Sequence, residues 1–149
     1  MSKHIPDLYG PNKQQVSAIL DRAAHLTPDE IVRAGNFMNH RMTEEWADAQ
    51  EAEAEAFEWS GRMDAWEPIW RAAERATRIS ADTGNWSAVK VEILGERDPS
   101  PDEIREAAQA GACGTAAHAA LATVVKDLIS EEHYGVLTAP WREAKLDAS

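Results

Sequence analysis

The acidic residues between positions 44 and 58 are the part of this sequence best suited to bind a metal ion. Seven carboxylates and no basic residue occupy these fifteen positions. Two carboxylates one helical turn apart can share a divalent cation, and Glu55 with Glu58 and Glu103 with Glu106 have that spacing. Acidic helices often have this spacing by chance, so it is weak evidence for a metal site. A metal-dependent hydrolase is therefore only an alternative, and no residue is assigned as catalytic or as a metal ligand.

Two other side chains of chemical interest, Cys113 and His118, lie in the uncharged run 107–125. No carboxylate lies beside His118 in the sequence to orient it as a base, so we expect a hydrogen-bonded core histidine. The one cysteine is surrounded by alanine and glycine and is expected to be a small buried thiol. The sequence has no cysteine cluster and no nucleotide-binding glycine loop, so no cofactor is predicted. We expect a protein without enzymatic activity rather than an enzyme.

The charge balance argues against several partners. The chain has fifteen Lys and Arg and 26 Asp and Glu, which gives a net charge of −11. This negative charge repels phosphate backbones and anionic membranes. No apolar run follows the basic residue near the N-terminus, so no secretory signal is expected. The uncharged run 107–125 is weakly apolar and fits a buried helix better than a membrane span. We therefore expect a cytoplasmic protein that binds neither nucleic acid directly nor a membrane.

Helix signals are distributed along most of the chain. Thr27 and Ser100 each precede Pro-Asp-Glu, which predicts a capping box with proline at the first helical position. Before Thr27, apolar residues of 12–26 fall on one helical face. Helices are also predicted over 44–60 and 65–80, with one kinked helix as the alternative because Gly61 and Pro68 interrupt the pattern.

The remaining segments complete the predicted bundle. The segment 85–95 suits either a strand or a short helix, and a short helix is preferred because no partner strand is visible. A long helix is expected over 101–129, followed by a short helix that begins after Ser130 and stops at Pro140. The prediction is an all-α, single-domain bundle of five to six helices around the small-residue helix 101–129. Residues 1–10 and 142–149 are expected to be loosely ordered.

Four tryptophans in and after the acidic segment define the predicted binding surface. Most of them share a three-and-four-residue spacing through 49–77 that is typical of one continuous apolar seam. This seam either packs against the small-residue helix or leaves part of the indoles exposed for a partner. The partner-binding residues that we predict are Trp46, Trp59, Trp66, Trp70, Glu51, Glu55 and Glu58.

The carboxylates themselves have two interpretations. They either form a solvated helix face or imitate a nucleic-acid backbone and so block a DNA- or RNA-binding protein. The residues of that second interpretation are Glu44, Glu45, Asp48, Glu51, Glu53, Glu55 and Glu58. The main prediction is a noncatalytic protein that binds a host protein or a second copy of itself, with a homodimer as one form.

The C-terminal stretch 124–144, VVKDLISEEHYGVLTAPWREA, carries a resemblance. Its matching residues are Asp127, Leu128, Ile129, His133, Tyr134, Leu137, Thr138, Pro140 and Trp141. With them it resembles the ending of small alanine- and tryptophan-rich helical proteins of actinobacteria and their phages. The resemblance covers about a seventh of the chain and implies an actinobacterial or phage origin and a role as a modulator of a host protein, with no catalytic residue carried over.

Overall fold

The computed structural model describes residues 11–38, 43–86, 100–144 and 146. Within these ranges the chain forms six α-helices with short 3₁₀ segments and no strand, which confirms the predicted all-α fold. The helices are α1 (Lys13–Ala23), α2 (Pro28–Met38), α3 (Glu44–Ser60), α4 (Trp66–Thr83), α5 (Pro101–Val124) and α6 (Glu131–Glu143), with the 3₁₀ turn η2 (Met63–Ala65) between α3 and α4.

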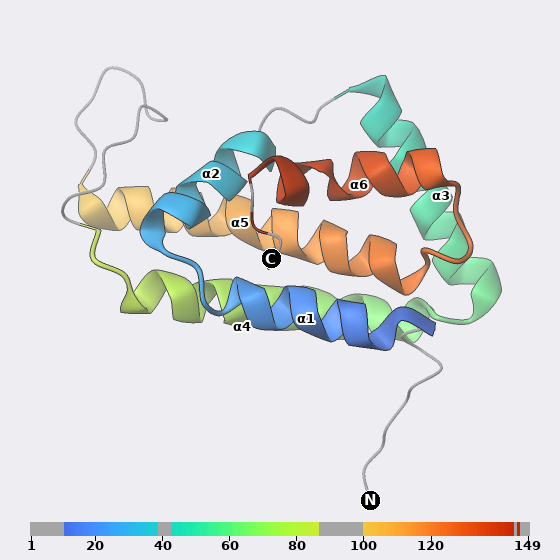
Figure 1. Ribbon diagram of the computed structural model, residues 1–149, viewed down its shortest axis with the longest axis horizontal. Helices are drawn as coiled ribbons and strands as arrows, with labels where there is room; N and C mark the ends of the chain where they lie inside the picture. The colour runs from blue at the N-terminus through green and yellow to red at the C-terminus, as the bar shows by residue number, and fades with distance from the viewer. Residues whose placement is uncertain (1–10, 39–42, 87–99, 145, 147–149) are drawn as a thin grey trace, which may run out of the picture.

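Helix α5 is the centre of the bundle. In Figure 1 it runs between α2 and α6 on one side and α1 and α4 on the other, and all four pack against it. Its residues 115–124 are buried without interruption. A helix that is apolar and small on every side can be surrounded in this way because neighbouring backbones approach it closely. The predicted central helix is therefore confirmed.

The closest of these approaches is the crossing of α2 and α5 at two glycines. A Cβ atom added to Gly111 would lie 2.6 Å from the Cα atom of Gly35. We expect Gly111→Ala to lower the free energy of unfolding by about 1–3 kcal/mol, because overpacking outweighs the better helix propensity of alanine. Chemical denaturation measures this change. Gly135→Ala is the matched control, since its Cβ would meet only the Arg142 Nη2 atom at 3.9 Å. Equal stabilities of the two variants would contradict the close approach of α2 and α5 at these glycines.

The predicted helix starts are confirmed in detail. Thr27 and Glu30 exchange reciprocal hydrogen bonds, and Ser100 and Glu103 do the same, so both capping boxes are present. The segments predicted at 44–60 and 65–80 are two helices rather than one kinked helix. The chain breaks between them at Gly61, whose φ of +78° lies in the left-handed region.

Helix α5 ends at Val124, five residues before the predicted end. Side chains from distant parts of the chain satisfy its last carbonyl groups: Asn12 Nδ2 donates to the Thr123 oxygen at 3.3 Å, and Arg62 Nη1 donates to the Val124 oxygen at 2.8 Å. Arg62 also binds the carboxylate of Asp127 in the following turn, which lowers the pKa of that carboxyl. The helix therefore has a tertiary cap that its own sequence does not indicate.

The expectation that Pro140 stops the last helix was wrong. Helix α6 begins after Ser130, as predicted, and continues through Pro140 to Glu143. Arg142 turns back along the helix and donates to the Gly135 carbonyl oxygen at 2.6 Å and to the Thr138 hydroxyl at 3.2 Å. Proline removes only the helical bond to the Val136 carbonyl oxygen, and the bonds of Arg142 link the turns on both sides of that gap.

Some predictions fall on the remaining residues. Residues 1–10, and the segment 85–95 from Ser87 onward, lie outside the part of the chain that the structure describes. Of the predicted loose tail 142–149, only 142–144 and 146 are described, and Leu146 is fully buried. Among the described helices, none combines the length and the apolar character that a membrane crossing requires.

Candidate functional site

Helix α3 has two contrasting faces, and both carry carboxylates. Its buried residues are Trp46, Ala49, Glu53, Ala56 and Phe57. Its exposed residues include Trp59 and a row of acids, each about one turn from the next, which are Glu44, Asp48, Glu51, Glu55 and Glu58. At 100° per residue these five acids and Trp59 fall on one side of the helix, opposite the buried face. The acidic face, as this set is called below, is the exposed candidate site.

Trp59 is the largest exposed apolar side chain of this region, with 67% of its surface accessible. Met63 follows in η2 and is 40% exposed. Both were predicted to lie in a continuous apolar seam, which was wrong. Helix α3 buries a set of positions that does not include Trp59, and the break at Gly61 separates Met63 from that helix. Indoles are enriched among the residues that contribute most to protein interfaces, so Trp59 is a candidate contact residue.

The structure does not bring the four predicted tryptophans together on one surface. Trp46 is 5% exposed and faces the interior, while Trp66 is half-buried and packs edge-to-face on Phe57 with ring centroids 5.1 Å apart. Trp70 is also half-buried and contacts His118. Among the predicted partner-binding residues, Trp59 with Glu51, Glu55 and Glu58 therefore forms the exposed set.

The buried face of α3 places a carboxylate against the central helix. Glu53 has no accessible surface, and its Oε1 atom lies 3.8 Å from Nδ1 of His118, which is 6% exposed. That distance is too long for a hydrogen bond, and neither Glu53 oxygen nor the Nδ1 atom has a hydrogen-bond partner among the described residues. The expectation of a hydrogen-bonded core histidine was therefore wrong for this ring nitrogen.

Two indoles enclose the histidine ring. Trp46 from α3 and Trp70 from α4 contact His118 edge-to-face, at centroid distances of 5.2 and 5.4 Å. The cluster of Glu53, His118 and these two indoles therefore joins α3, α4 and α5. A charge in such apolar surroundings is costly unless it is paired.

Burial determines the protonation of Glu53. Loss of hydration raises the pKa of its carboxyl above the ordinary 4.5, and the nearby His118 opposes this only in part. Glu53 was placed with the carboxylates that could imitate a nucleic acid, and its burial removes it from any such surface. The signal in the sequence was the spacing of Trp46, Ala49, Glu53 and Ala56, which forms a second seam with an acid in a core position.

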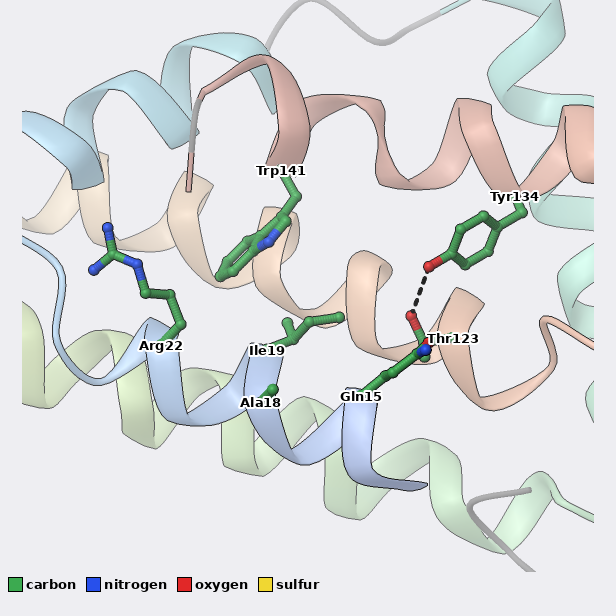
Figure 2. Close-up of a pocket in the computed structure, with 7 residues that line it drawn as sticks. All are labelled: Gln15, Ala18, Ile19, Arg22, Thr123, Tyr134 and Trp141. Atoms are coloured by element: carbon green, nitrogen blue, oxygen red, sulfur yellow. Dashed lines mark hydrogen bonds between the residues drawn. The ribbon is translucent and has the colours of Figure 1, made fainter. Parts of the chain in front are cut away.

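A separate pocket lies between α1, α5 and α6. It has a volume of about 280 Å³ and is lined by Gln15, Ala18, Ile19, Arg22, Thr123, Tyr134 and Trp141. Figure 2 shows the apolar side chains in its middle, the Tyr134 hydroxyl with Thr123 at one end and Arg22 at the other. Most of its wall is apolar, with polar atoms near the two ends.

Other candidates for chemistry have structural roles. Arg71 and Arg78 form exposed ion pairs with Glu67 and Glu74 one turn earlier on the same helix. Cys113 is buried, and burial raises the pKa of its thiol to about 11, so the unreactive thiol form dominates at neutral pH. Within the described ranges, no three His, Cys, Asp or Glu side chains are grouped closely enough to hold a metal ion.

Comparison of the chain with protein-family models, with curated proteins and with solved structures found no match.

Proposed function

We propose that this chain is a noncatalytic, cytosolic protein-binding protein and that the acidic face of α3 is its docking surface. The observation that supports this best is the 67% exposure of Trp59 in line with five carboxylates. Burying the indole against a partner removes a large apolar surface from water, which favours binding. The surrounding carboxylates favour partners with a positively charged surface. The proposed partner is a protein with a basic surface around an apolar pocket.

The charge distribution supports a basic partner. Seven of the 26 acidic residues lie in 44–58, where no basic residue compensates them. The ion pairs of α4 lie on a different helix, and the acids of the acidic face have no ion pair with the described basic residues. Unpaired carboxylates keep their full field and accelerate encounter with a positively charged surface.

The C-terminal resemblance guides the choice of partner. It is the basis for proposing an actinobacterial or phage origin and a role in modulating a host protein. A small protein without catalytic residues acts by occupying a surface of another protein. An actinobacterial lysate is therefore the first place to search for the partner.

Capture from that lysate with charge-reversed variants tests the proposal. The immobilised wild type and a Glu106→Lys control are expected to retain the same proteins, because Glu106 is exposed on α5 away from the acidic face. The double variant Glu51→Lys with Glu55→Lys is expected to lose at least one of them, as identified by mass spectrometry. Identical capture by all three proteins would contradict the proposal.

Nucleic-acid mimicry remains a second candidate because the carboxylate row is exposed. From Glu44 to Glu58 it extends about 21 Å at about 1.5 Å per residue, with five charges, whereas phosphates of one DNA strand follow every ~3.4 Å. The lower charge density and the indole within the row favour protein docking. Mimicry predicts that capture disappears with added salt and survives Trp59→Ala. Docking of Trp59 predicts that added salt weakens capture only in part and that Trp59→Ala abolishes it.

A further inference from the structure

We propose that the pocket between α1, α5 and α6 binds a small, neutral, single-ring aromatic molecule that carries a hydrogen-bond donor. This inference is independent of the acidic face, which lies on α3. Its arguments are the size of the pocket, the direction of one hydrogen bond and the neutralisation of its charged group.

The size of the pocket limits its ligand. An apolar cavity of about 150 Å³ is enough to hold a benzene ring, and pockets for drug-sized ligands begin near ~300 Å³. At about 280 Å³ this pocket, which opens to solvent beside the exposed Gln15 and Ala18, accommodates one substituted ring and is too small for an extended peptide. Ile19 and Trp141 supply apolar surface on opposite sides of it (Figure 2).

The hydroxyl of Tyr134 is available as an acceptor. Thr123 donates its single hydroxyl hydrogen to the Ala119 carbonyl oxygen at 2.8 Å. In the 3.3 Å contact between the Thr123 and Tyr134 hydroxyls, the tyrosine must therefore be the donor (Figure 2). Its oxygen lone pairs then remain available to accept a hydrogen bond from a ligand. The ammonium group of Lys126 lies 4.9 Å from the centre of the tyrosine ring and helps to hold it in place.

The opposite end of the pocket does not favour an anion. Arg22 donates to the carbonyl oxygens of Leu146 and His25 and binds the carboxylate of Glu30 at 2.7 Å. Glu30 thereby neutralises the guanidinium charge at short range. The pocket has no other charged lining residue, which favours a neutral ligand.

The test uses p-cresol and toluene as probes, because they differ only by the hydroxyl donor. In ¹H–¹⁵N spectra, p-cresol is expected to shift the indole N–H signal of Trp141 and the side-chain amide of Gln15. It should bind about 3- to 10-fold more tightly than toluene, the range of one net hydrogen bond. Tyr134→Phe should remove that difference while leaving toluene binding unchanged.

Two further variants separate loss of the pocket from loss of the fold. Ala18 is exposed on α1 and lines the pocket, so Ala18→Leu should fill it and weaken both probes. Gln14→Leu adds the same side chain at an exposed position of α1 outside the pocket and should leave both affinities unchanged. Failure of both probes to bind the wild type at 10 mM would overturn the proposal. Equal affinities for the two probes, or much tighter binding of N-acetyltyrosinamide than of p-cresol, would also overturn it.

Discussion

Glu53→Gln is expected to make the protein more stable, by about 1–3 kcal/mol in the free energy of unfolding at pH 8, because each unit by which burial raises the pKa of this carboxyl costs about 1.4 kcal/mol above that pKa. Glutamine has the same shape as glutamate and removes the charge that the wild type buries without a hydrogen bond. Most substitutions in a protein core destabilise it, so a gain here would be diagnostic of the buried carboxylate.

The pH dependence of this gain follows from the raised pKa of Glu53. The unfolded chain releases the proton near the ordinary 4.5, whereas the folded chain holds it to higher pH. The stability associated with protonated Glu53 is therefore complete below about pH 4.5 and is lost as the pH rises through the raised pKa. Wild type and Glu53→Gln should have similar stability at pH 4 and diverge toward pH 8.

Urea denaturation of both proteins between pH 4 and pH 8 measures the effect. Glu55→Gln is the matched control, because Glu55 lies on the exposed side of the same helix and its change should stay within about 0.5 kcal/mol. A loss of stability in Glu53→Gln at pH 8 would contradict the account. It would mean that ionised Glu53 forms a strong charge-assisted hydrogen bond, whereas the structure places its carboxylate 3.8 Å from His118.

Trp59→Ala is expected to weaken binding of the captured partner by at least about 2 kcal/mol, or roughly 30-fold in Kd, as for a central aromatic hot spot. The same substitution should leave the free energy of unfolding within about 0.5 kcal/mol of the wild type, because Trp59 makes few contacts in the isolated chain. Calorimetric titration and denaturation measure the two quantities separately.

Ile79→Ala provides the matched control for Trp59. Ile79 is also a large apolar side chain in water, with 48% of its surface exposed, but it lies on α4. It should retain the wild-type affinity. Equal losses in the two variants would indicate general apolar adhesion, and an unchanged affinity in Trp59→Ala would exclude the indole from the interface.

The helix starts could be predicted from the sequence because their signals are local. A capping box needs only four consecutive residues, and those at Thr27 and Ser100 are both present in the structure. The end of α5 could not be predicted in this way. It depends on Asn12 and Arg62, which reach the last carbonyl groups from 111 and 62 residues away in the sequence.

The orientation of α3 could not be predicted because two seams satisfy the same spacing. One contains Ala52 and Trp59, and the other contains Trp46 and Glu53. The predicted seam was the first, whereas the structure buries the second and leaves Trp59 in water. The contacts that bury the second seam come from other helices, because His118 of α5 lies against Trp46 and Glu53 and α6 packs along α3, and they are not encoded within α3.

The central claim, that Trp59 on the acidic face is the docking residue, can be measured directly from the indole N–H signals. The six tryptophans give six such signals, and the spectrum of Trp59→Phe assigns the one from Trp59. On addition of the captured partner, the account predicts that the Trp59 signal shifts or broadens. The Trp86 signal should stay unchanged, because its N–H is bonded to the Ala81 oxygen at 2.8 Å in the core. An unchanged Trp59 signal in the saturated complex would contradict the account.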